Sequence, residues 1–310
     1  MVVIRGRGRR SNCGGLRPPR LALSAALALA PTVPIASPAS AQTAPTVETE
    51  DATLGELDVS EARFHPSVTL DLRNGDFSRG EYDDDDADLN RVPLHLQFAF
   101  AGQLGRDASG EANLWLVGVS SNGFHAPSAD ERTSPRAWYE SNNLLALIAA
   151  PATGLKAGLV YTFKTSPNGV SDSTHEASAT FAYQAERGLG ALRPQFVATW
   201  RPKGGGGLFT QIGVEPEFDL SEADSAATVS LPARLGVGWA GFYERGTGDV
   251  LYGSAGAAYS HPFRLGDTRW RLRAELLAVI RDEALRRLGA SRATRAAVVP
   301  LATVSLTLAY

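Results

Sequence analysis

The sequence predicts an all-β fold, a transmembrane antiparallel up-and-down β-barrel of about 12 strands. Three observations lead to this prediction. From residue 63 onward, apolar and polar residues alternate with a period of two, as side chains do on the two faces of a strand. Many alternating segments run for about ten residues, which is longer than most soluble strands and long enough to cross a bilayer. The chain also ends on such a segment, with Tyr310 as its last residue.

Length and charge exclude some classes of protein. With 310 residues, of which 44% are hydrophobic, the chain can form one large β-barrel domain. Its net charge of -3 argues against a nucleic-acid-binding protein, which is usually strongly basic. No stretch approaches the roughly 18 uninterrupted apolar residues of a membrane-spanning helix, whereas a spanning strand needs only about 9 to 11 residues with alternate ones apolar.

Residues 1–41 are predicted to be a signal peptide. A basic, arginine-rich segment precedes an apolar run over 21–30, and small residues at 39–41 suit cleavage before Gln42. An amphipathic helix and, because of the pair Arg9–Arg10, a twin-arginine signal are the alternatives.

The mature chain is expected to contain no cysteine, because the single cysteine, Cys13, lies before the apolar run. Neither a disulfide nor a cysteine metal site is therefore expected. The next segment, 42–62, is polar and acidic without a period, which predicts a flexible periplasmic N-terminal segment that contributes little to the fold. Residues 63–310 form the predicted barrel.

The strands follow one another along this domain. The clearest is 92–100, in which five apolar residues recur at strict spacing two. Segments 112–120 and 138–149 show a weaker apolar–polar alternation, because the first is apolar on both faces and the second alternates only in part. The complete set of predicted strands is 68–73, 92–100, 112–120, 138–149, 155–164, 176–184, 192–201, 208–218, 228–239, 251–263, 269–280 and 298–310.

The last strand is predicted to close the barrel. One of its faces carries Pro300, Ala302, Val304, Leu306, Leu308 and Tyr310. In a soluble sandwich this strand would be one edge among several, whereas in a closed barrel it must pair with the first strand and leave no backbone edge unpaired. We therefore expect it to pair with the segment around 68–72, with both chain ends in the periplasm.

Two further regularities favour a membrane barrel over a soluble sandwich, which also alternates. Longer connections, around 74–90, 121–135, 240–249 and 281–296, alternate with shorter ones, although 201–206 and 219–226 blur the contrast. Aromatic residues recur near the ends of the apolar faces, as interfacial girdles do. Gly, Ser, Thr and Gln fill the opposite face, which suits a water-filled or polar-packed lumen.

These features resemble Gram-negative outer-membrane β-barrel proteins. The resemblance rests on the signal, the amphipathic strands from Phe64 onward and the ending 304–310, and it covers nearly the whole mature chain. Stretches 138–143 and 161–168 resemble an uncharacterised porin-like family. The resemblance implies location in the cell outer membrane, contact with outer-membrane lipids and lipopolysaccharide, and assembly by the barrel-assembly machinery and periplasmic chaperones. It transfers no functional site.

The resemblance also implies a barrel-assembly signal in the last strand. Its residues are Val304, Leu306, Leu308 and Tyr310. Most barrels of this class end in Phe, so Tyr310 is a mild departure.

Charged residues in the strands opposite the apolar face are the candidate lumen-lining residues. They are Lys156, Glu176, Arg193, Arg201, Glu215, Arg234, Arg271, Arg273 and Glu275. Such residues either line a pore and tune its ion preference or form ion pairs that pack a narrow or plugged lumen. The basic stripe of 269, 271 and 273 would favour anions in an open pore, unless nearby glutamates neutralise it.

Other chemistry has weaker support. The acidic run Asp83–Asp86 is either a divalent-cation site or a solvated loop, and it lacks the spacing of a dedicated calcium loop. A lipid hydrolase would need a Ser, a His and an orienting group together. The clusters 173–176 and 140–142 do not supply them, because adjacent strand residues point to opposite faces. The five histidines have no metal-ligand spacing, so no enzyme, cofactor or metal site is expected.

The expected function is porin-like passage of small solutes across the outer membrane. The alternatives are a non-conducting structural or surface-binding barrel and, with the weakest support, a barrel-embedded lipid hydrolase.

Overall fold

The protein is described by a computed structural model that covers residues 42–310 apart from 76, 83–91, 109, 128–130, 204–205, 221–226, 244–246, 267 and 289–294. The predicted signal peptide 1–41, with Cys13, and the acidic run Asp83–Asp86 lie outside the described residues. No helix in the described part of the chain is long and apolar enough to cross a membrane.

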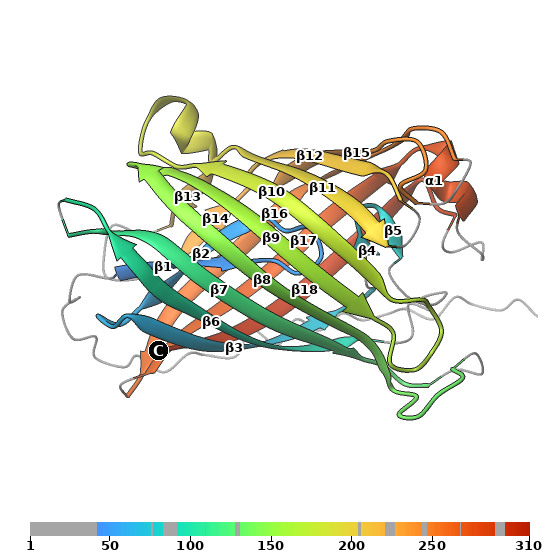
Figure 1. The fold of residues 1–310 in the computed structure, drawn as a ribbon, viewed down its shortest axis with the longest axis horizontal. Coiled ribbons are helices and arrows are strands. Elements are labelled where there is room, and N and C mark those ends of the chain that lie inside the picture. The colour runs from blue at the N-terminus through green and yellow to red at the C-terminus, as the bar shows by residue number, and fades with distance from the viewer. Residues whose placement is uncertain are drawn as a thin grey trace, which may run out of the picture. The chain divides into compact units, whose positions relative to one another are not determined.

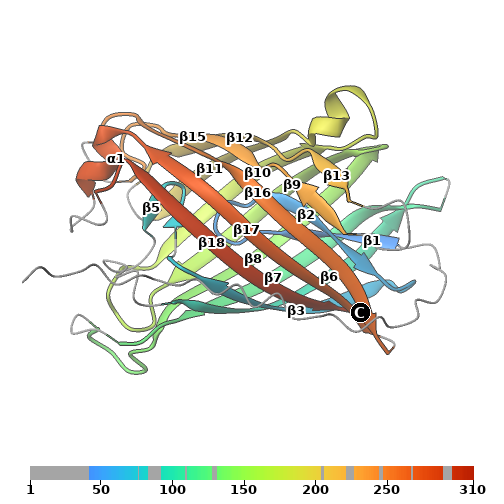
Figure 2. The same cartoon turned by 180° about the vertical axis from the view of Figure 1, so that it is seen from behind.

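The main body is a closed antiparallel barrel of 12 strands, as the sequence predicts (Figures 1 and 2). The sheet contains 14 strand segments, because two of the crossings are each interrupted once. In chain order its segments are β3 (Phe64–Arg73), β6 (Leu94–Arg106), β7 (Ala112–Phe124), β8 (Trp138–Ala152), β9 (Leu155–Thr165), β10 (Thr174–Tyr183), β11 (Gln195–Lys203), β12 (Leu208–Val214), β13 (Glu217–Asp219), β14 (Thr228–Ser230), β15 (Ala233–Gly238), β16 (Val250–Leu265), β17 (Thr268–Arg281) and β18 (Val298–Ala309).

Proline explains the two interruptions. The predicted strand 208–218 is split into β12 and β13 at Pro216, and 228–239 is split into β14 and β15 at Pro232. Proline has no N–H to donate to the ladder, so regular pairing stops there. The sheet stays continuous, because β14 and β15 both pair with β16.

The closing strand pairs as expected. In β18, Leu306 lies opposite Leu70 of β3, and the neighbouring pairs extend the same antiparallel register across 68–72. The Tyr310 N–H donates to the Pro66 carbonyl at 3.1 Å, so the ladder reaches the last residue. The expected pairing is confirmed.

The two faces of the barrel differ in polarity. Large apolar side chains point outward and are exposed, among them Leu159 at 68%, Trp200 at 56% and Ile280 at 57%. Polar side chains such as Thr180 and Thr199 point inward and are buried. An apolar outer surface over a polar interior is the arrangement of a transmembrane barrel and the reverse of a soluble one.

The N-terminal segment is an ordered part of this fold, in contrast to the expected flexible segment 42–62. Strands β1 (Gln42–Val47) and β2 (Leu54–Val59) form an antiparallel hairpin, here called the inner hairpin. It lies within the barrel lumen, where its side chains contact the inward faces of several strands (Figure 2). Its acidic residues, which resemble a solvated linker in sequence, are paired with basic residues of the barrel.

Three further elements lie in the connections at the barrel end opposite Tyr310, here called the loop end. They are β4 (Phe77–Ser78), β5 (Glu81–Tyr82) and helix α1 (Glu283–Leu288). Phe77 and Leu285 are buried in an apolar cluster with Phe209, Phe242 and other inward residues. A short helix, η1 (Gly188–Leu192), lies in a turn at the opposite end.

Candidate functional site: the barrel lumen

One side of the lumen, here called the charged wall, carries ionisable side chains. They are Arg234, Arg271, Arg273 and Glu275, from β15 and β17, and Glu215, which lies in the break between β12 and β13 rather than in mid-strand as expected.

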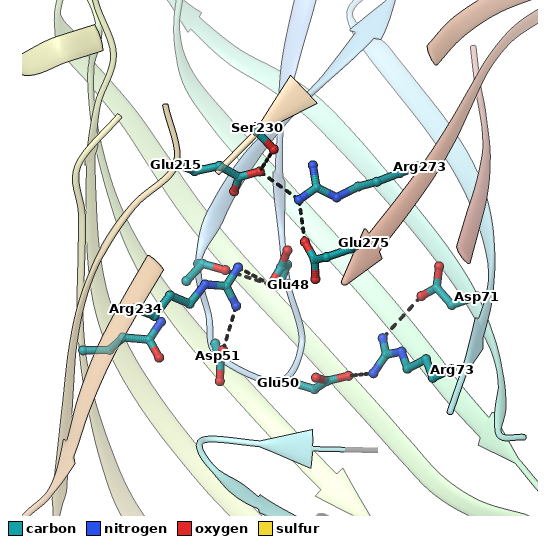
Figure 3. A network of polar contacts seen from close by, with 12 residues as sticks. Glu48, Glu50, Asp51, Asp71, Arg73, Glu215, Ser230, Arg234, Arg273 and Glu275 are labelled. Carbon is teal, nitrogen blue, oxygen red and sulfur yellow. Dashed lines mark hydrogen bonds and ion pairs between the residues drawn. The ribbon is translucent and has the colours of Figure 1, made fainter. Parts of the chain in front are cut away.

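The inner hairpin pairs with this wall at two levels. Near its turn, Asp51 Oδ2 accepts from Arg234 at 3.2 Å, and Glu48 lies 3.6 Å from the same guanidinium (Figure 3). Nearer its open end, Arg271 donates to Asp58 at 3.1 Å and to the Glu56 carbonyl at 2.8 Å. The acidic hairpin therefore matches the basic residues of the wall in both sign and position.

A second group of charges pairs within the wall itself. Arg273 donates to Glu215 at 2.8 Å and to Glu275 at 2.6 Å, and the Ser230 hydroxyl donates to Glu215 at 2.7 Å (Figure 3). The arginine is thus shared between two carboxylates, and two members of the predicted basic stripe, Arg271 and Arg273, are paired with acidic residues in the folded chain.

Two further basic side chains reach the hairpin from other strands. Arg73 of β3 binds Glu50, and it also donates to Asp71 at 3.3 Å. Lys156 of β9 binds Glu56 of the hairpin. Basic side chains therefore hold the hairpin from several directions.

The opposite side of the lumen is apolar and is here called the apolar wall. It consists of the inward side chains Trp115, Val117, Val119, Leu144, Ala146 and Ile148 of β7 and β8. They form one buried cluster with Ala44, Val47, Leu54 and Val59 of the inner hairpin. This packing explains why 112–120 and 138–149 alternate poorly, since their lumenal faces are apolar as well as their outer faces.

The loop end contains a buried ion cluster. Arg79, from the turn between β4 and β5, donates two parallel hydrogen bonds to Glu176 of β10, at 2.7 and 2.8 Å. Arg201 of β11 donates to the same carboxylate at 2.9 and 3.1 Å. The side chains of Arg79 and Glu176 are 2% and 1% exposed, and both guanidinium groups lie over the ring of Phe242. Two donors therefore satisfy one buried carboxylate, as a buried charge requires.

The charge of Arg79 is maintained despite its burial. Desolvation lowers the pKa of Arg79, but the carboxylate of Glu176, through its charge and its hydrogen bonds, raises that pKa above the ordinary value. The guanidinium therefore stays protonated. Sequence reasoning missed this residue, because it lies in an aperiodic connection and carries no motif.

The candidate lumen residues differ in position. Arg193 lies in the turn after η1 rather than within a strand, in a left-handed conformation with φ of 49°, and it pairs with Glu217. The expectation that it lies in mid-strand is wrong, because Pro194 delays the start of β11 to Gln195. The other eight each make an ion pair: Lys156, Glu176, Arg201, Glu215, Arg234, Arg271, Arg273 and Glu275.

The proposed assembly residues lie on β18 and at its end. Val304 and Tyr310 are 48% and 50% exposed, and Leu306 and Leu308 are half-buried on the same face.

Of the clusters considered for hydrolysis, 173–176 is divided between the two faces of the barrel. His175 contacts the rings of Tyr161 and Phe163, whereas its neighbour Glu176 points into the lumen. Glu140 and Asn142 are both buried and share a hydrogen bond. Among the described residues no three His, Cys, Asp or Glu side chains are placed to hold a metal ion.

Comparison with known proteins assigns no activity. No protein-family model matches the chain, and no curated protein matches it in sequence. A solved bacterial polysaccharide outer membrane secretin is similar at 11% identity over 81% of this chain and 99% of that one, with a TM-score of 0.43. The translocator domain of autotransporter NalP from Neisseria meningitidis is similar at 10% identity over 81% of this chain and 89% of that one, with a TM-score of 0.41.

Proposed function

We propose that this chain is an outer-membrane barrel for porin-like passage of small solutes, which its own inner hairpin keeps closed at rest. The observation that carries the proposal is the pairing of the hairpin with the barrel across the lumen, through Asp51 with Arg234 and Asp58 with Arg271. A segment held in a lumen by contacts with its wall blocks passage, and its displacement opens the path.

Partial solvation of the charged contacts supports reversible closure. Arg271 and Asp58 are 28% and 36% exposed, and Glu48 is 58% exposed although it lies beside the charged wall. Ion pairs that retain this much solvent contribute about 0 to 1 kcal/mol each and weaken with salt. The contact between Arg271 and Asp58 can therefore open at modest cost, and its opening exposes charges that face small solutes.

The membrane setting is part of the same proposal. The apolar outer surface suits contact with outer-membrane lipids and lipopolysaccharide, and the exposed face of β18 suits recognition by the barrel-assembly machinery during biogenesis.

Deletion of Tyr310 is then expected to lower the amount of folded barrel in the outer membrane, measured by heat-dependent gel migration of membrane fractions. Tyr310→Phe serves as the control, because it keeps the aromatic ring. Equal amounts of folded barrel for the unaltered chain, the Tyr310 deletion and Tyr310→Phe would contradict a role of Tyr310 in assembly.

A second candidate is a non-conducting barrel whose loop end binds a partner. The buried cluster of Arg79, Glu176 and Arg201 favours it, because that cluster occupies part of the lumen at the loop end and contains no residue of the inner hairpin.

Conductance in a planar bilayer separates the two candidates. We expect rare, small current steps from the mature chain and frequent, larger steps from a variant that lacks 42–59. Arg287→Ala is the matched control, because Arg287 forms an exposed ion pair with Glu283 on α1, away from the lumen. A folded deletion variant that remains silent would refute solute passage and leave the surface-binding barrel.

A further inference from the structure

A polar cavity of about 200 Å³ lies at the loop end of the lumen. Residues near the loop ends of β8, β9 and β10 form one side, and the β4–β5 hairpin and the loop after β15 form the other. The cavity has space for roughly six or seven water molecules, at about 30 Å³ each in the liquid. The cavity is therefore large enough to hold one small molecule.

The rim of this cavity is built from mutually bonded connections. Asn168 is fully buried, and its carbonyl accepts from the N–H groups of Arg132 and Thr133, each at 2.9 Å. The Ser166 hydroxyl donates to Asn168 Oδ1 at 2.7 Å. These bonds join the connection after β9, which carries Ser166 and Ser171 of the lining, to the connection after β7.

Two polar atoms of the lining have no hydrogen-bond partner among the described residues. They are Asn142 Oδ1, an acceptor, and Arg79 Nε, a donor. Asn142 is 1% exposed and Arg79 is 3% exposed. The remaining groups of both side chains are bonded, to Glu140 and Glu176 respectively. A buried donor and a buried acceptor without partners are costly unless a ligand satisfies them, and a hydroxyl group can do both.

The rest of the lining suits an uncharged, hydroxyl-rich molecule. Ser78, Thr165, Ser171 and Thr174 supply further hydroxyl groups. Basic Arg79, Lys164 and Arg201 are balanced by acidic Glu81, Glu140 and Asp172. Tyr139, Phe242 and Tyr243 add apolar surface, against which the C–H groups of a ring can pack. A simple anion or cation would find no excess of opposite charge here.

We propose that the loop-end cavity binds a small neutral polyhydroxylated molecule, either a free monosaccharide or polyol or the terminal sugar of a surface glycan. The hydroxyl groups of this molecule bond to the polar side chains of the lining, and Asn142 and Arg79 border the site. This binding does not require passage through the barrel, so it goes beyond the proposed function.

The test is titration of the folded mature barrel, held in a detergent without a sugar headgroup, with heat release and saturation-transfer NMR as readouts. The probes are glucose, galactose, mannose and inositol, with phosphate and glycine as charged and zwitterionic comparisons. We expect saturable binding of at least one neutral probe. A trisaccharide of the bound sugar distinguishes the sources, because a free-sugar site rejects it and a glycan-end site accepts it.

Two variants locate the site. Asn142→Leu is expected to weaken the binding about tenfold, since it removes the buried acceptor. Ser171→Trp is expected to abolish binding by filling the cavity from its exposed rim without changing a barrel strand. Thr180→Val is the matched control, because Thr180 is also buried on an inward face with an unpartnered oxygen among the described residues, but does not line the cavity.

Three results would overturn the proposal. They are no saturable binding of any neutral probe, stronger binding of phosphate or glycine, and unchanged binding in the folded Ser171→Trp variant. None of these depends on whether the barrel conducts.

Discussion

The two walls of the lumen hold the same hairpin by different physical means. On the apolar wall, Trp115, Val117 and Ile148 are 4%, 1% and 1% exposed and pack against the hairpin. On the charged wall, the side chains of Arg234 and Arg271 remain 20% and 28% exposed although each forms an ion pair with the hairpin. One contact excludes water and the other retains it.

This difference predicts how the docking energy is divided. Full burial of a Val or Leu side chain contributes about 1.5 to 3 kcal/mol, whereas a partly exposed ion pair contributes about 0 to 1 kcal/mol. We therefore expect the apolar wall to supply most of the affinity for the hairpin. The charged wall instead sets its orientation, because only one placement brings Asp51 to Arg234 and Asp58 to Arg271.

The largest expected effect comes from a charge on the apolar wall. Val117→Asp places an unpaired carboxylate in a dry contact, which costs several kcal/mol and should release the hairpin. A thiol introduced by Ala44→Cys, at a hairpin residue that is 2% exposed, reports the release through its labelling rate. We expect labelling to be accelerated by about tenfold or more. Val117→Ile, which keeps the site apolar, is the control, and equal labelling in both variants would contradict the role of this wall.

A smaller effect is expected on the charged wall. Arg271→Ala removes the partner of Asp58 but leaves this carboxylate, whose side chain is 36% exposed, in contact with solvent. The labelling rate of the same reporter should rise by only about two- to fivefold, which corresponds to about 1 kcal/mol or less. Arg193→Ala is the control, because its ion pair with Glu217 lies outside the hairpin. A larger effect than that of Val117→Asp would reverse the proposed order of the walls.

The smallest effect is expected from salt. Raising the ionic strength from 0.1 M to 1 M shortens the screening length from about 10 Å to about 3 Å. Reporter labelling should increase by less than about twofold in the otherwise wild-type barrel and should increase less in Arg271→Ala, which lacks one of the more solvated pairs that hold the hairpin. An equal response in both chains would show that the solvated ion pairs do not contribute to docking.

The sequence allowed most of the barrel to be predicted, since each strand has its own local signal. The pairing of β18 with 68–72 could also be predicted from the sequence. In a closed barrel the last strand pairs with the strand before it on one side and with the first strand on the other. The weak alternation of 112–120 was itself informative, since both faces of β7 meet apolar surroundings. The inner hairpin was missed because its strands are only six residues long and its acidic composition resembles that of a solvated linker.

The sequence by itself determined the strands, their outward faces and the closing register, because a period of two depends on neighbouring residues only. The tertiary structure alone decided that the lumen is occupied and which charges meet in it. Arg79 and Glu176 are 97 residues apart in the chain, Asp51 and Arg234 are 183 apart, and Asp58 and Arg271 are 213 apart. Such partners are chosen by closure of the barrel around the hairpin, and no local pattern specifies them.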